Sequence, residues 1–253
     1  MFGRLLSLFF GKTKHYPAVK KAGYPRAVRK LIEQKLEKLE SLIGYSISEP
    51  EHYIKAITHK SFSEFNSIHL ENNERLEFLG DSVLGMVIAE YLFNRYEEKD
   101  EGFLTKTRSH LVSRAALGHY ASKISLIDYL MVNENYTTVT PKGIVSIMSN
   151  AIEALIGAIY MDKGMEEVKQ FINKYIILPG VSEGAIFADY NYKSQLLEYS
   201  QSQKMELPGY FLIKEEGPQH NKVFTVEVAI GAQKLGYGNG RNKKEAEQKA
   251  ACP

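Results

Sequence analysis

The sequence predicts a chain of two domains, an all-α domain followed by a small α+β domain in the order α-β-β-β-α. Apolar residues recur at helical spacing in the first part, and no strand pattern appears before about residue 205. Three strand-like runs then lie between two helical segments: GYFLIKEEG, KVFTVEVAI and QKLGYGNG. We expect an arm over 1–40, a helical domain over 41–178, a linker over 179–189 and the α+β domain over 190–253.

Each expected helix has its own justification in the spacing of its apolar residues. These helices cover 24–43, 72–96, 103–124, 146–160, 165–177 and 193–203. A last helix starts after Asn242, an N-cap residue type, and Glu245 three residues later completes a capping-box pattern. GYGNG is rich in glycine, but it ends a strand beside a hairpin and lacks the βαβ setting of a dinucleotide site.

Charge is unevenly distributed along the 253 residues, although the formal net charge is only +2. Residues 1–50 carry 10 Lys and Arg against 4 Asp and Glu, whereas residues 51–188 carry 13 against 18. A basic arm on an acidic body favours a polyanionic partner and a metal-collecting centre, although a basic tail that only aids solubility fits the charge as well. The single cysteine, Cys252, excludes an internal disulfide framework and favours a reducing, cytoplasmic compartment.

The opening run MFGRLLSLFFGK is apolar but too short to span a bilayer, and no small-residue cleavage site follows it. We interpret it as an amphipathic N-terminal helix, with weak contact to a membrane surface as the alternative. No membrane partner is expected for the rest of the chain.

An anionic stripe borders the core face of the helix that starts in NNERLEFLGDSVL. Glu74, Glu77 and Asp81 fall within an arc of about 60° on a helical wheel, and the leucines and valines cluster on the other side. Like charges at this spacing repel one another, and Arg75 is the only base in the segment. Because Mg²⁺ prefers carboxylate oxygens, the stripe predicts either a metal site or a plain acidic helix face.

A second helix, SNAIEALIGAIYMDKG, is almost entirely apolar yet contains Glu153, with Asn150 one turn earlier on the same side. A lone Glu in such a helix is seldom buried without a partner. Either Glu153 pairs with a base in the core, or it completes an oxygen-ligand cluster together with the acidic stripe.

These residues resemble the signature of the ribonuclease III family. NERLEFLGDSVL carries the likeness, and AITHKSF, DEGFLTKTRSHLVSR and NAIEALIGAIYMDKG follow the family's order of helices. GPQHNKVFTVEV and NKKEAEQKAA resemble pieces of a double-stranded-RNA-binding domain. The resemblance covers roughly residues 50 to 252, and two motif sets in the right order are more specific than either alone.

The resemblance implies a divalent-metal-dependent endoribonuclease that hydrolyses phosphodiesters of double-stranded RNA and leaves 5′-phosphate and 3′-hydroxyl ends. It implies a homodimer with one cleavage centre per subunit, Mg²⁺ as cofactor with Mn²⁺ as a substitute, and roles in ribosomal precursor processing and mRNA turnover. Carried onto this chain, Glu77, Asp81 and Glu153 match metal ligands, and Asp81 and Glu153 are the expected catalytic pair. Glu74 and Glu101 match further acidic positions of the dimer cleft.

One position departs from the family, which usually has an aspartate where this chain has Asn150. An amide oxygen still ligates Mg²⁺ but carries no charge, so we expect an active enzyme that needs more metal. The neutral residue also leaves an alternative, a catalytically impaired dimeric protein that binds double-stranded RNA. A metal phosphohydrolase acting on small molecules is disfavoured by the appended RNA-binding domain.

The RNA-binding residues follow from how such domains read A-form RNA, through two minor grooves and the phosphates between them. Hydroxyl and phosphate groups are the expected ligands, and a helix N-terminus attracts phosphate. The predicted contacts are Ser194, Glu198 and Gln201 on one face of the first helix, His220 in the loop GPQH, and Lys243 and Lys244 at the start of the last helix.

Overall fold

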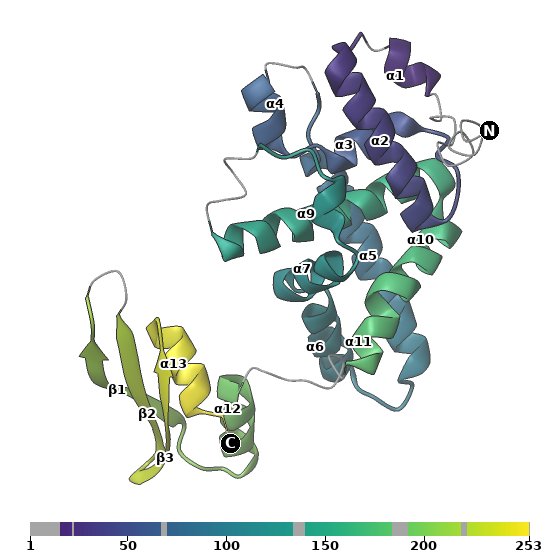
Figure 1. The fold of residues 1–253 in the computed structure, drawn as a ribbon. Coiled ribbons are helices and arrows are strands. Elements are labelled where there is room, and N and C mark those ends of the chain that lie inside the picture. Colours follow the sequence, from purple (N-terminus) through teal and green to yellow (C-terminus); the bar gives the residue numbers. More distant parts are fainter. Residues whose placement is uncertain are drawn as a thin grey trace, which may run out of the picture. The chain divides into compact units, whose positions relative to one another are not determined.

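The computed structural model describes residues 16–21, 23–66, 70–133, 140–183, 192–218 and 222–252. The chain forms two compact units, Met1–Phe187 and Ala188–Pro253. The first unit is helical, and the second contains three antiparallel strands and two helices (Figure 1). The fold class predicted from the sequence is therefore confirmed.

The first unit is built from helices that surround a single hydrophobic core. In chain order its elements are α1 (Pro17–Lys21), α2 (Arg26–Ile43), α3 (Pro50–Ile57), α4 (Lys60–Asn66), α5 (Glu74–Arg95), α6 (Glu101–Leu111), α7 (Arg114–Lys123), the 3₁₀ turn η2 (Leu126–Tyr129), α9 (Pro141–Lys163), α10 (Met165–Ile172), the π-helical turn η3 (Asn173–Ile177) and α11 (Leu178–Ser182). Ile32, Leu36 and Leu39 of α2 are fully buried, so the expected N-terminal arm includes a helix that belongs to this core.

Helices α5 and α9 meet at two glycines in the middle of the core. A Cβ atom on Gly80 would lie 1.7 Å from the backbone carbonyl oxygen of Glu153, and one on Gly157 would lie 2.5 Å from that of Leu76. No side chain larger than hydrogen fits at either position without separating the helices. The two backbones are therefore in direct contact, and residues one turn away on each helix face one another.

Helix α9 is the one described helix that is long and apolar enough to cross a bilayer by length and composition. Of the qualifying window, 61% is buried inside the protein, because the apolar residues of this helix pack against α3, α5, α7 and α10. Thr140 caps the helix, and its hydroxyl accepts a hydrogen bond from Gly143 N at 3.1 Å.

The single helix predicted over 103–124 is wrong, since the structure has two helices there, α6 and α7. Ser113 lies between them in an extended conformation, and its hydroxyl accepts a hydrogen bond from Ala116 N at 3.2 Å. This N-cap starts a new helix in a new direction. Leu178–Ser182, where the predicted linker begins, forms the short helix α11 because Gly180 packs directly against Leu111 and Tyr120.

The second unit contains α12 (Tyr192–Ser202), β1 (Pro208–Glu216), β2 (Val223–Ile230), β3 (Gln233–Gly240) and α13 (Lys243–Ala250). The sheet order is β1-β2-β3, with Tyr210 opposite Val228 and Val228 opposite Gly236. Its small core joins Val226 and Val228 to Ala246 and Ala250 of α13.

The glycines of GYGNG have a packing role. A Cβ on Gly238 would lie 2.2 Å from the backbone carbonyl oxygen of Ala246, so glycine lets α13 rest directly on β3. The predicted cap of α13 is present, because Asn242 Oδ1 accepts a hydrogen bond from Glu245 N at 2.9 Å. The Glu245 carboxylate accepts from Arg241 N at 3.0 Å, one residue before the position of a standard capping box.

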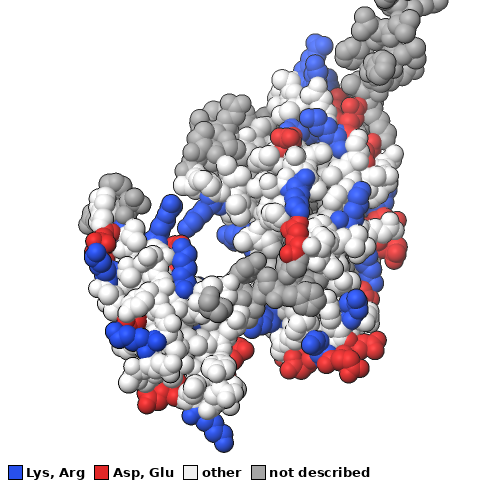
Figure 2. All heavy atoms as spheres, turned by 60° about the horizontal axis from the view of Figure 1, so that its bottom comes forward, with Lys and Arg blue, Asp and Glu red and all other residues white. Residues whose placement is uncertain are grey.

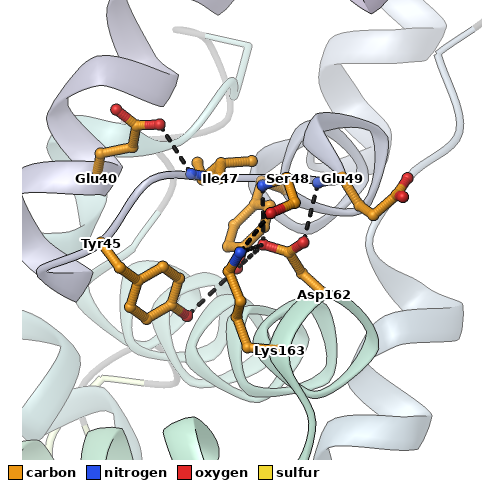
Figure 3. Close-up of polar contacts among 8 residues, drawn as sticks. Glu40, Tyr45, Ile47, Ser48, Glu49, Asp162 and Lys163 are labelled. Carbon is orange, nitrogen blue, oxygen red and sulfur yellow. Dashed lines mark hydrogen bonds and ion pairs between the residues drawn. The ribbon is translucent and has the colours of Figure 1, made fainter.

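A buried carboxylate at the C-terminal end of α9 holds the segment that leads into α3 (Figure 3). The Asp162 side chain has no exposed surface and accepts hydrogen bonds from Ser48 N at 3.2 Å, Glu49 N at 3.0 Å and the Tyr53 hydroxyl at 3.1 Å. Lys163 Nζ lies 3.6 Å from the same carboxylate. Burial and the hydrogen bond with Tyr45 raise the pKa of Tyr53 above its usual range, so its hydroxyl keeps its proton.

We predict that Asp162→Ala lowers the free energy of unfolding of the helical unit by about 2–3 kcal/mol, because it removes the acceptor of the buried Tyr53 hydroxyl and of two backbone N–H groups. Urea unfolding followed by far-ultraviolet circular dichroism measures this. The control is Glu71→Ala, which removes an ion pair of 3.0 Å with Lys55 in which the Glu71 side chain is 62% exposed. The control should cost less than about 1 kcal/mol. Equal losses in the two variants would contradict the role of Asp162.

Candidate functional site

The crossing of α5 and α9 brings together the acidic residues that the sequence singles out. Glu77 and Asp81 lie one on each side of Gly80 along α5, and Glu153 provides the carbonyl that touches this glycine. Asn150 lies one turn before Glu153 on α9. The structure therefore places carboxylates from two helices near one another at this crossing.

The half-buried Glu153 has the most perturbed carboxyl group of the cluster. Burial, followed by the negative charges of Asp81 and Glu77, raises its pKa to about 7, and the positive charge of Arg114 opposes this effect. The alternative of a core Glu paired with a base does not hold within the described residues, because no ion pair involves Glu153 there. A carboxylate that remains unpaired beside two others is typical of a functional site.

The Asn150 side chain lies close enough to Glu77 to lower the pKa of its carboxyl group. Burial and the charge of Glu74 raise the pKa of Glu77, whereas Arg114 and the Asn150 amide lower it. Glu74 is exposed at the start of α5, and Lys60 Nζ lies 3.6 Å from its carboxylate. An acid at position 150 would instead repel Glu77 and raise the pKa of its carboxyl group.

The carboxylates are close neighbours, yet they do not converge on a single point. Within the ranges that the structure describes, no three His, Cys, Asp or Glu side chains are close enough together to hold one metal ion. The donor types nevertheless fit a hard divalent cation, since three carboxylates and one amide offer only oxygen ligands. A half-buried acid with a raised pKa is also a site where a bound cation would relieve repulsion.

Glu101 is not brought to this cluster within one subunit. It begins α6, beyond the C-terminal end of α5, and its carboxylate accepts a hydrogen bond from the Thr105 hydroxyl at 2.6 Å. Helix α5 has 22 residues, which corresponds to about 33 Å, so Glu101 and Glu77 lie near its opposite ends.

A surface pocket of about 250 Å³ adjoins the cluster. It is lined by the residues at the starts of three helices, which are His59 and Lys60 of the α4 region, Asn73, Glu74 and Glu77 of the α5 region, and Gly143, Ser146, Ile147 and Asn150 of α9. Ser146 accepts a hydrogen bond from Arg114 Nη1 at 3.2 Å, which places this arginine beside the pocket wall.

A second stripe on α5 is apolar and exposed. Phe78 is 79% exposed, Met86 51% and Phe93 70%, and their spacing puts them on one side of the helix. Two further pockets, of about 620 and 420 Å³, lie along this stripe. Large exposed apolar residues in a row mark an interaction surface.

The second unit places the predicted RNA contacts on its two helices. Ser194, Glu198 and Gln201 share one face of α12, and Lys243 and Lys244 occupy the first two positions of α13. Lys243 lies close enough to Glu215 of β1 to help lower the pKa of that carboxyl, after the larger effect of Lys222. His220 lies outside the described residues. On the face in Figure 2, basic and acidic side chains are interspersed on this unit.

Sequence reasoning missed two features of the site. The apolar spacing over 103–124 predicts one long helix with Arg114 in its interior, whereas the structure places Arg114 at the start of α7, beside the cluster. The second feature is the exposed apolar stripe of α5. The sequence contains a signal for it, because Phe78, Met86 and Phe93 recur at intervals of eight and seven residues and form a stripe separate from the core stripe.

Comparison with known proteins agrees with both units. Residues 49–179 match the family model described as ribonuclease-III-like, and residues 192–252 match the double-stranded RNA binding motif. The first match covers more than half of the chain and contains the whole carboxylate cluster.

Curated relatives extend the likeness over most of the chain. Ribonuclease 3 of Staphylococcus haemolyticus is 38% identical over 220 residues, which cover 87% of this chain and 89% of that protein. Ribonuclease 3 of Syntrophomonas wolfei is 44% identical over 196 residues, which cover 78% and 83%.

Among solved structures, a nuclease domain of ribonuclease III from Campylobacter jejuni is similar with a TM-score of 0.51 and 38% identity, covering 56% of this chain and 95% of that one. That structure is described by flexibility in a region involved in dimer formation. The fold, the two matched motifs and the relatives together show that this chain belongs to the ribonuclease III family, whose members are metal-dependent nucleases that act on double-stranded RNA.

Proposed function

We propose that this chain hydrolyses phosphodiester bonds of double-stranded RNA at the α5–α9 crossing and leaves 5′-phosphate and 3′-hydroxyl ends. The carboxylate cluster carries the proposal, because Glu77 and Asp81 meet Glu153 there without a neutralising ion pair among the described residues. The repulsion within such a cluster destabilises the protein unless a bound cation offsets it. The appended RNA-binding unit supplies the substrate class.

The proposed metal is Mg²⁺, with Mn²⁺ as a substitute, and the proposed ligands are Glu77, Asp81, Asn150 and Glu153. A bound divalent cation would neutralise the anionic phosphate, lower the pKa of an attacking water and stabilise the leaving oxygen. Asp81 and Glu153 are the proposed catalytic pair, since they orient that water and cation. Glu153 must release its proton for this role, because its own surroundings raise its pKa to about 7.

We also propose a homodimer formed through the apolar stripe of α5. Phe78, Met86 and Phe93 form a row of exposed apolar side chains on one helix, and the adjoining pockets can accept side chains from a second copy. Glu101 lies at the other end of α5 from the cluster, so an antiparallel pairing would bring it toward the partner's acids. Glu74 and Glu101 are then the additional acidic residues of the dimer cleft.

The second unit is proposed to hold the duplex. Ser194, Glu198, Gln201 and His220 would contact minor-groove hydroxyls, and Lys243 and Lys244 the phosphates between the grooves. A cytoplasmic location and roles in ribosomal precursor processing and mRNA turnover complete the proposal. A catalytically impaired duplex-binding dimer remains the second candidate, because Asn150 removes one negative charge from the cluster.

We predict that Glu153→Gln abolishes cleavage of a labelled RNA duplex in Mg²⁺ but leaves its affinity for the duplex unchanged. The cleavage rate should fall at least about a hundredfold, since losing even an outer contact of a metal ligand costs about 10- to 100-fold. The control is Glu166→Gln, which removes the same charge from an exposed position on α10. If the unaltered protein binds the duplex but does not cut it in either Mg²⁺ or Mn²⁺, the chain is the impaired binding protein.

We predict that Asn150→Asp lowers the Mg²⁺ concentration needed for half-maximal cleavage and also lowers the unfolding temperature in EDTA. The added carboxylate is a charged ligand, but in EDTA it repels Glu77, whose pKa the neutral Asn150 amide lowers. A metal titration and a thermal scan measure the two effects. Asn94→Asp, at an exposed position of the same unit, is the control and should change neither. An unchanged Mg²⁺ requirement in Asn150→Asp would show that Asn150 is not a metal ligand.

We predict that Phe78→Asp raises the dimer dissociation constant by at least about a hundredfold, because it places a charge in the middle of an apolar contact. Sedimentation velocity over a concentration series measures the dissociation constant. Phe211→Asp changes a similar residue, 54% exposed on β1, and should leave the dimer intact. A Phe78→Asp protein that sediments like the unaltered one would show that α5 is not the interface.

A further inference from the structure

Arg114 is held beside the carboxylate cluster in a fixed position. It is the first residue of α7, and the Ser113 cap sets the start of that helix. Its guanidinium donates from Nη1 to the Ser146 hydroxyl on α9 at 3.2 Å. Because Ser146 also lines the 250 Å³ pocket next to Glu77 and Asn150, the guanidinium lies at the edge of the cluster.

The guanidinium is near the carboxylates but is not paired with them. Its charge reaches both Glu77 and Glu153, since it opposes the rise in the pKa of each. Yet among the described residues it forms no ion pair with either carboxylate, and its hydrogen bond to Ser146 is the only one there. A guanidinium has five N–H donors, so most of them remain available to a ligand.

Helix α7 itself gains little stability from this placement. A cation in the first turn of a helix lies at the positive end of the helix dipole, which is unfavourable. The side chain is exposed, and one hydrogen bond to a serine adds little. An anionic ligand arriving at the cluster would explain both the position and the unused donors.

We propose that Arg114 binds the two non-bridging oxygens of a phosphate in the cleaved RNA strand, next to the scissile bond. This rests on the proposed function and adds a substrate-binding residue outside the carboxylate set. The planar guanidinium matches a phosphate with two parallel hydrogen bonds, which ammonium groups do not provide. With Asn150 neutral and Arg114 positive, the cluster repels an approaching phosphate less than a fully acidic site would.

The test combines a protein change with a matched change in the RNA. Full-length protein, Arg114→Gln, Arg114→Lys and the control Arg26→Gln, an exposed arginine of α2, are given a duplex that carries a single neutral methylphosphonate. The substitution is moved through the phosphates that flank the cleavage site. Single-turnover cleavage in Mg²⁺ and duplex affinity in EDTA are both measured, together with the unfolding temperature in EDTA.

Arg114→Gln should slow cleavage of the unmodified duplex by about 10- to 100-fold, and Arg114→Lys should restore only part of the rate. At one phosphate, the methylphosphonate should slow the unaltered protein and Arg26→Gln by the same factor but cause no further loss in Arg114→Gln. Independent losses at every phosphate would overturn the proposal. A fall in the unfolding temperature of Arg114→Gln without the phosphate-specific pattern would show that Arg114 acts only as a counter-ion for the carboxylates.

The EDTA arm separates this proposal from the proposed function. If the unaltered protein does not cut the duplex, the nuclease assignment fails, but the same phosphate-specific pattern in the dissociation constants would still support the Arg114 contact. If the unaltered protein cuts the duplex but neither measurement shows a phosphate-specific pattern, the nuclease assignment holds and the proposed phosphate contact of Arg114 is wrong.

Discussion

The backbone contact of α5 with α9 at Gly80 and Gly157 is the constraint on which the rest of the helical unit depends. No side chain lies between the helices at this point, so the two backbones are in direct contact. A Cβ on Gly80 would clash with the backbone carbonyl oxygen of Glu153. Residues one turn from the contact must then face one another across a short distance. The position of the acidic cluster therefore depends on the absence of a Cβ atom at Gly80 and Gly157.

This close approach also sets the electrostatics of the site. The packing that fixes α9 against α5 withdraws Glu153 from water and places it near Asp81 and Glu77, so its pKa rises to about 7. The Asn150 amide and the Arg114 guanidinium act in the opposite direction on Glu77. The cluster is therefore held in a strained charge state that a polyanion alone would worsen and that a cation would relieve.

Helix α9 contributes to both the core and the candidate site, and its two ends make different contacts. Its apolar middle fills the core, and its N-terminal turns line the pocket beside the cluster. At its C-terminal end, Asp162 binds the backbone that leads into α3. A change in how α9 packs would therefore move the carboxylates and the α3 connection together.

The sequence by itself determined that a helical part precedes an α-β-β-β-α part, and it placed Glu77 and Asp81 on one stripe, because both follow from the local periodicity of a chain. Only the tertiary structure decided that Glu153 meets them and that Arg114 lies beside them unpaired. The break before α7 was likewise missed, since a serine cap changes direction without disturbing the apolar spacing. Contacts between helices depend on crossing position and depth, which two glycines set here and which no single helix encodes.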